Sequence, residues 1–159
     1  MRRSEREITD PKFMHAVLED TGELYIALNT EEAPYLFCVN HFFHDGELYF
    51  HCAPEGRKLD LMRRDPRVGF FTAADITVDG TTTRYRSVYG TGIMEPVRDA
   101  DLKAAALTSL AKKFHAPCKF PVSEEKFAYT MLIHIRIEAM TCKYSRREEG
   151  PRTVPHFVS

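Results

Sequence analysis

Residues 128–138 constrain the fold most strongly, because apolar and polar side chains alternate along them. One set of alternate positions is apolar and comprises Tyr129, Met131, Ile133, Ile135 and Ile137. Only Leu132 departs from the pattern. Alternate residues of an extended strand lie on the same face, so the segment predicts a half-buried β-strand.

Turn residues elsewhere separate further strand-like segments. Asp45-Gly46 is a strong hairpin signal, and residues 74–83 predict a loop. Gly90 and Gly92 mark a bulge, a bend or the close approach of another backbone. The six predicted strands cover residues 24–29, 35–43, 47–52, 68–73, 84–97 and 128–138.

Three helices are expected between and before these strands. Asp10-Pro11 and Asp99 are helix-start signals for segments over residues 11–19 and from residue 99 onward. A shorter helix follows Lys58 and stops before Asp65-Pro66. The sequence therefore predicts a mainly β protein with flanking helices, either a closed or nearly closed barrel or a sandwich. A barrel of this size is filled by its own side chains, so a ligand would bind in a groove outside it.

Composition limits the function classes. The chain has 159 residues and a formal net charge of −1, so one domain is expected and no overall field attracts nucleic acid or anionic lipid. No apolar run approaches the ~20 residues that span a bilayer. Four cysteines without CxxC spacing suggest reduced thiols. We therefore predict a cytoplasmic protein that binds neither membrane nor nucleic acid.

The segment YFHCAPEGRK, residues 49–58, runs from a strand into a turn that carries Arg57 and Lys58. Main-chain N–H groups at a helix start favour an anion, and two cations beside them add charge-assisted hydrogen bonds. An anion site is one interpretation of the pair, and an ordinary solvated helix start is the other.

Three segments together resemble the FMN-binding split-barrel proteins of the pyridoxamine 5'-phosphate oxidase-like superfamily, and most of all their nitroimidazole-resistance (Nim) type. They are MRRSEREITD, VNHFFHDGELYFHCAPEGRKLDLMRRDPRVGF and TRYRSVYGTGIMEPV. The resemblance runs from about Arg2 to Lys143. It implies a six-stranded antiparallel split β-barrel over residues 1–143, with residues 144–159 as a C-terminal tail of the same domain.

The resemblance also implies a homodimer with two FMN sites at the subunit interface. By that likeness Arg57 and Lys58 bind the FMN phosphate. The backbone of residues 37–40 lies against the flavin ring, which adds Phe37, Cys38, Val39 and Asn40. His51 and Cys52 follow the ribityl chain and the ring edge, and Ser87 with Arg86 reaches across the interface.

Several of these residues have a second interpretation. His51 is either a catalytic hydrogen-bond or proton donor over the flavin or a core histidine bonded to backbone. Cys52 is more typical of a small buried apolar residue than of a nucleophile. Cys38, His41 and His44 invite a metal site together with His51 and Cys52, but strand alternation separates them, and no metal is predicted.

Two classes of function follow from the resemblance. The first is an FMN-dependent oxidoreductase for a small-molecule substrate, specifically a reductase of nitroaromatics such as 5-nitroimidazoles. The second is a non-catalytic flavin- or haem-binding redox buffer or sensor. The chain departs from the Nim pattern at ADITVDGTTTR and at Cys142-Lys143, so its substrate pocket is expected to differ.

Overall fold

The computed structural model describes residues 4–116 and 127–145. In them one sheet of eight strands has the order β3-β2-β6-β7-β8-β5-β4, with β1 paired to β8. The elements in chain order are η1 (Ser4–Arg6), β1 (Glu7–Ile8), α1 (Pro11–Asp20), β2 (Glu23–Leu28), β3 (Tyr35–Asn40), β4 (Phe42–His44), β5 (Glu47–Cys52), α2 (Arg57–Arg64), β6 (Arg67–Asp79), β7 (Thr82–Pro96), α3 (Ala100–Lys113) and β8 (Met131–Ser145).

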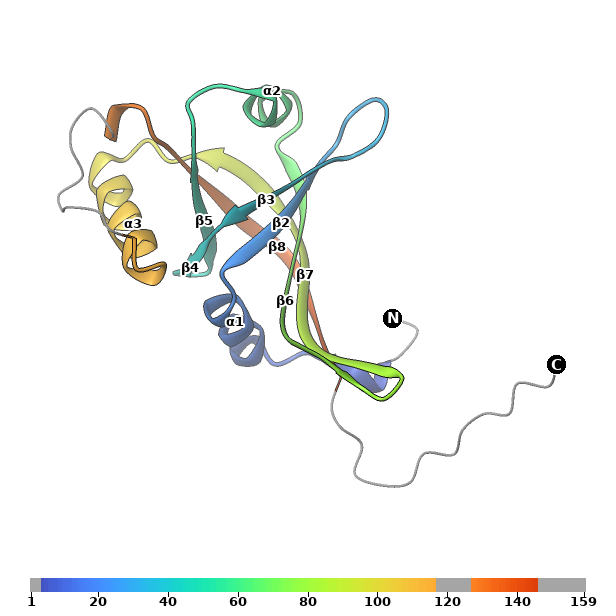
Figure 1. The fold of residues 1–159 in the computed structure, drawn as a ribbon. Helices are drawn as coiled ribbons and strands as arrows, with labels where there is room; N and C mark the ends of the chain where they lie inside the picture. Colours follow the sequence, from blue (N-terminus) through green and yellow to red (C-terminus); the bar gives the residue numbers. More distant parts are fainter. Residues whose placement is uncertain (1–3, 117–126, 146–159) are drawn as a thin grey trace.

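The sheet curls around a core, with α2 near one end, α1 near the other, and α3 beside β4 and β5 (Figure 1). All of its strand pairs are antiparallel. This confirms the predicted mainly β, antiparallel split barrel with flanking helices. The expected count of six strands was wrong, because β1 adds a strand and the segment 35–43 divides at His41 into β3 and β4. The sheet path ends at these two strands, so the barrel is not closed.

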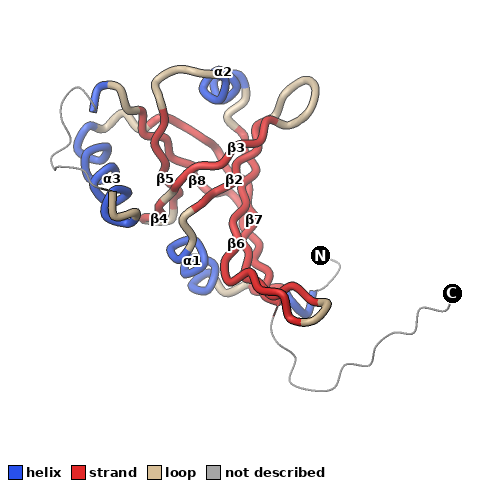
Figure 2. The backbone as a smooth tube through the Cα atoms, viewed as in Figure 1, coloured by secondary structure: helices blue, strands red, loops and turns tan. Residues whose placement is uncertain are grey.

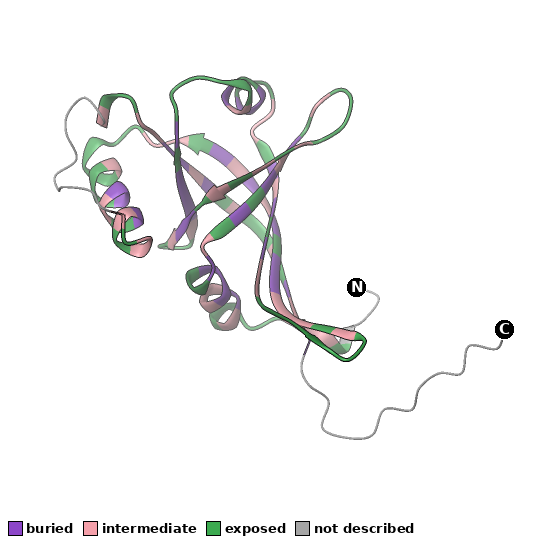
Figure 3. Ribbon diagram, in the orientation of Figure 1, coloured by how far each residue is buried: buried purple, intermediate pink, exposed green. Residues whose placement is uncertain are grey.

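The predicted loop over residues 74–83 is a strand hairpin instead. Strand β6 continues to Asp79 and β7 begins at Thr82, with Gly80 at φ 59° in the turn. Asp75 has φ 55°, and the pairing register shifts between Ala74 and Thr77. Figure 2 shows this hairpin extending past α1, and Figure 3 shows its end exposed on both sides. Because the hairpin covers no core, its sequence lacks the alternation that reveals a half-buried strand.

The core lies inside the curl and also under α3. Ile133 and Ile135 of β8 are fully buried in the main cluster. Leu132 faces the other side of the sheet, where it packs with Ala106 and Leu110 of α3. Its departure from the alternation is therefore explained by a second, smaller core on the opposite face.

Helix α1 is anchored at its end by His41. The ring of His41 is fully buried, with Nδ1 3.1 Å from the Gly22 carbonyl oxygen and Nε2 3.0 Å from that of Leu18. The Lys113 ammonium donates to the neighbouring Thr21 carbonyl at 2.6 Å. Burial and then the charge of Lys113 lower the pKa of His41 to about 4. His41 is therefore neutral near pH 7, and one of its two ring nitrogens donates.

We expect the free energy of unfolding to fall as the pH decreases from about 6.5 to about 4. Above that window His41 is neutral in both states, whereas inside it the unfolded chain binds the proton more readily than the folded chain. The full penalty is roughly 3 kcal/mol, from ~1.4 kcal/mol per pKa unit. Urea unfolding of wild type and His41→Gln at pH 7.5 and pH 5 measures it. An equal loss of stability in both proteins would contradict this role of His41.

Candidate functional site

The turn between β5 and α2 presents two cations at a helix start. Gly56 is the N-cap and has φ 121°, a conformation that glycine adopts more readily than other residues. Its carbonyl accepts hydrogen bonds from the N–H groups of Leu59 at 2.9 Å and Asp60 at 3.3 Å. No side chain caps this helix. Its first N–H groups are therefore free to meet an anion beside Arg57 and Lys58.

Both cations lie over aromatic rings of β3. The Arg57 guanidinium carbon is 5.2 Å from the centre of the Tyr35 ring, and Lys58 Nζ is 5.1 Å from the centre of the Phe37 ring. Such contacts hold the two charges above one strand. Sequence reasoning found Arg57, Lys58 and Phe37, which the structure brings together. It missed Tyr35, although Tyr35 lies two residues before Phe37 and shares its face.

The four β3 residues predicted to meet the flavin alternate in exposure. Phe37 and Val39 are partly buried and pack against the core. Cys38 and Asn40 are exposed on the opposite face. Their side chains therefore cannot all face one ligand, and a contact from the whole segment would have to use its backbone.

His51 and Cys52 point to opposite faces of β5. His51 is exposed, so the core-histidine interpretation was wrong. Partial burial and the charge of Lys58 lower the pKa of His51 below its usual value. Cys52 belongs to the core, where burial raises the pKa of its thiol despite Lys58. His51 is thus a neutral donor at pH 7, and Cys52 is a protonated thiol.

Arg86 and Ser87 lie on β7, away from the Gly56 turn. The Arg86 guanidinium donates to the carboxylates of Asp75 and Asp20, on β6 and at the end of α1. Ser87 points to the opposite, outer face and lines a cavity of about 320 Å³ with Phe71, Tyr85, Tyr89, Thr141 and Lys143. Within one chain, the structure does not bring this pair to Arg57 and Lys58.

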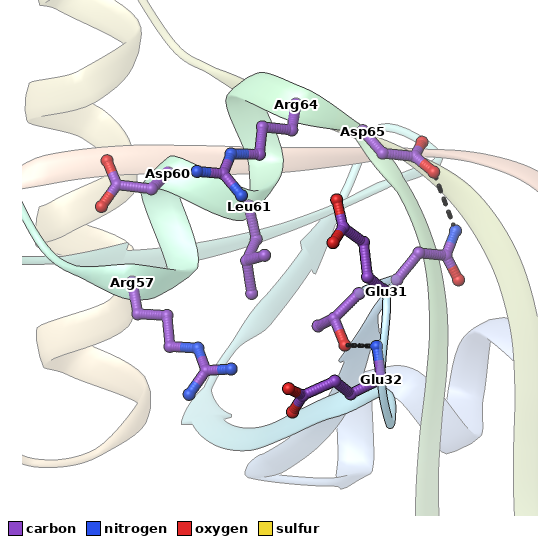
Figure 4. A pocket seen from close by; sticks show the side chains of 9 residues that line it. Glu31, Glu32, Arg57, Asp60, Leu61, Arg64 and Asp65 are labelled. Carbon is purple, nitrogen blue, oxygen red and sulfur yellow. Dashed lines mark hydrogen bonds between the residues drawn. The ribbon is translucent and has the colours of Figure 1, made fainter.

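A larger cavity of about 580 Å³ lies between α2 and the β2–β3 loop (Figure 4). Arg57 is part of its wall, so the cavity continues from the predicted phosphate anchor. Sequence reasoning did not identify the other lining residues, which are Asn29, Thr30, Glu31, Glu32, Asp60, Leu61, Arg64 and Asp65. On α2, the spacing of positions 57, 60, 61 and 64 would have placed them on one helical face.

The outer face of the sheet carries a row of exposed aromatic side chains. Tyr25 pairs with Phe71 and Phe71 with Tyr89, and these rings are 45%, 42% and 53% exposed. Leu36, 65% exposed, lines the same groove of about 480 Å³. Val88, around which the sequence suggests an interface, is already fully buried inside one chain. Any apolar interface on this face therefore centres on Tyr89 and its neighbours.

Two further searches cover residues 4–116 and 127–145. Within these ranges, no group of three or more His, Cys, Asp and Glu side chains is placed to hold a metal ion. None of the helices described there has the length and apolar character needed to cross a bilayer.

Solved structures with the same fold include several flavin proteins. A Bacteroides thetaiotaomicron protein, provisionally described as a 5-nitroimidazole antibiotic resistance protein, has a TM-score of 0.75 at 20% identity, over 86% of this chain and 85% of that one. The flavocytochrome Anf3 of Azotobacter vinelandii gives 0.81 at 16% identity, over 96% and 75%. An FAD-binding protein of Mesorhizobium loti gives 0.69 at 22% identity, over 89% and 98%.

A family model assigns most of the chain. No curated protein is similar enough to the sequence to count as a match. The family model described as pyridoxamine 5'-phosphate oxidase, in contrast, matches residues 10–144. The match includes the Gly56 turn, β3 and β5, and it extends to Tyr144 of β8. The chain therefore belongs to the pyridoxamine 5'-phosphate oxidase family.

Proposed function

We propose that this protein is a flavin-dependent oxidoreductase that binds FMN with the phosphate at the Gly56 turn. The observation that carries the proposal is the convergence of Arg57, Lys58 and uncapped N–H groups next to the aromatic side of β3. A phosphate monoester carries about two negative charges and three acceptor oxygens. Two cations and a helix start supply matching charge and donors, so the residues present fit the group.

When bound, the flavin supplies the electron-transfer chemistry. The chain supplies the surroundings. The backbone of residues 37–40 would flank the ring system, and exposed His51, beside Lys58, would donate a hydrogen bond or proton to a substrate. Cys52 would contribute only through its backbone, because its side chain is in the core.

The specific activity that we propose is reduction of a nitroaromatic such as a 5-nitroimidazole. The likeness to the Bacteroides thetaiotaomicron protein supports this choice of substrate class. His51 supports it chemically, because reduction of a nitro group consumes protons as well as electrons. We place the activity in the cytoplasm, and the free thiols of Cys38, Cys52 and Cys142 are compatible with a reducing compartment.

The site that we propose is completed by a second copy of the chain. A homodimer would cover the exposed row of Tyr25, Phe71 and Tyr89, an apolar face of the kind that marks an interface. Ser87 lies beside this row and would then reach the partner's cofactor. Arg86 would act there only by exchanging its bonds to Asp75 and Asp20. Sedimentation velocity of the purified protein tests this, and a monomer that binds flavin tightly would exclude the shared site.

A non-catalytic flavin- or haem-binding redox buffer or sensor is the alternative function. It is favoured by the fold shared with the flavocytochrome Anf3 and with a Mycobacterium smegmatis protein that binds FAD and haem. Both functions use the same cofactor surface, so fold alone does not separate them.

The proposed function is tested by a visible spectrum followed by a single turnover. We expect purified protein to be yellow, or to become so with FMN, and to show flavin bands rather than a haem Soret band. After anaerobic reduction, a 5-nitroimidazole should reoxidise the flavin much faster than buffer does. A flavin spectrum without faster reoxidation would favour the buffer or sensor, and a protein that binds no flavin would refute both.

A further inference from the structure

We infer that the cofactor site extends past the flavin phosphate into the cavity beside α2 and takes the AMP half of a flavin dinucleotide there. FAD would then bind more tightly than FMN. The inference rests on the proposed function, because Arg57 belongs both to the phosphate anchor and to the cavity wall.

The first support is the position and size of the cavity. It begins at Arg57 and continues along α2 past Leu61 to Arg64, two helical turns further on, for which ~10 Å of helix is expected. The β2–β3 loop forms the opposite wall (Figure 4). Its volume of about 580 Å³ lies within the range typical of small-molecule sites. A ligand anchored at Arg57 can therefore extend directly into it.

The second support is the balance of charge that remains after internal ion pairs are counted. Asp60 is held by Arg63 at 2.8 Å, and Asp65 is held by Arg67 at 2.7 Å and by Asn29 at 2.9 Å. Within the described part of the chain, Arg64, Glu31 and Glu32 have no such ion pair. Figure 4 shows Glu31 and Glu32 on the loop across the cavity from the helix that carries Arg57 and Arg64. The cavity thus offers two cations and two carboxylates.

This set of groups matches the AMP half of a dinucleotide. A diphosphate linked at both ends carries one negative charge on each phosphoryl group, so it has about the same total charge as the FMN monoester. Arg57 and Lys58 would hold the flavin-side group and Arg64 the other. Glu31 and Glu32 would accept hydrogen bonds from ribose hydroxyls and the adenine amino group. A site for FMN alone has no use for Arg64 or for a polar cavity of this size.

Affinities of the purified protein, stripped of flavin, for FAD and for FMN test the inference by calorimetry. We expect FAD to bind at least ~10-fold more tightly, the scale of one bond between charged groups. Arg64→Gln should remove most of that difference and leave FMN affinity unchanged. Arg98→Gln is the control for net charge, since Arg98 is exposed between β7 and α3 and lies outside the cavity.

Each contrary outcome has a separate meaning. Tight FMN binding with equal or weaker FAD binding would overturn the extension and leave the proposed function intact, with Glu31 and Glu32 repelling the second phosphoryl group. Equal losses for FMN and FAD in Arg64→Gln would also overturn it, because Arg64 would then act on the shared half. A protein that binds neither flavin would refute the proposed function as well.

Discussion

Replacing both Arg57 and Lys58 by alanine should weaken FMN binding by roughly 10²-fold or more. A hydrogen bond to a charged group contributes about 1.5–3 kcal/mol, and every ~1.4 kcal/mol is tenfold in affinity. The cation–π contacts with Tyr35 and Phe37 hold both charges near the turn before any anion arrives. The free protein would therefore be partly preorganised, and little affinity would be spent on ordering these side chains. Titration of wild type and variant with FMN measures the loss.

Riboflavin provides the matched control on the ligand side, because it lacks only the phosphate. Wild type and the double variant should bind riboflavin equally, which would assign the whole loss to the phosphate contacts. Arg63→Ala is the control on the protein side, since Arg63 lies on the same helix, 58% exposed and paired with Asp60. An unchanged FMN affinity in the double variant, or an equal loss for riboflavin, would remove the phosphate from the Gly56 turn.

The elements predicted correctly are those with a local physical signal. Asp45 and Gly46 both have positive φ, 50° and 82°, as the hairpin turn that they predict requires. The Asp10 side chain accepts a hydrogen bond from the Lys12 N–H at 3.0 Å, and the Asp99 side chain accepts one from the Leu102 N–H at 2.8 Å. Caps and tight turns depend on neighbouring residues alone, so the sequence is sufficient to find them.

The errors arise where a segment depends on distant parts of the chain. The hairpin over residues 74–83 extends beyond the core, so Ile76 and Val78 remain 64% and 77% exposed and no alternation records the strands. The break at His41 exists because its ring is buried against carbonyls at the end of α1. Neither tertiary contact can be read from the residues around the break.

The candidate site divides in the same way. Arg57 and Lys58 could be found because a strand, a turn and a helix start follow each other directly in sequence. The cavity could not, because Glu31 and Arg64 come from a loop and a helix separated by three strands along the chain. Arg86 shows the opposite case, since its predicted role left out Asp75 and Asp20, which hold it in the fold.

His51 decides between catalysis and binding alone, and its geometry makes the test clean. It is exposed on β5, pairs through its backbone with Leu132 of β8, and lies within the electrostatic influence of Lys58. An exposed side chain away from the core contributes little to stability, usually within ~0.5 kcal/mol. A loss of activity on its removal would therefore not be a consequence of unfolding. His44, exposed on β4, is the matched control for replacing a surface histidine.

His51→Ala should lower nitroimidazole turnover by roughly 10²-fold, the scale of general acid catalysis, and leave flavin affinity and melting temperature nearly unchanged. The pH profile gives a second readout. Partial burial and Lys58 lower the pKa of His51, so its protonated form is populated only as the pH falls below about 6.5. If His51 delivers a proton, wild-type turnover should rise as the pH falls through its pKa, and His51→Ala should lose that rise while His44→Ala keeps it. A His51→Ala protein with wild-type turnover at every pH would leave His51 outside the reaction, and the binding function would then be the better account of this site.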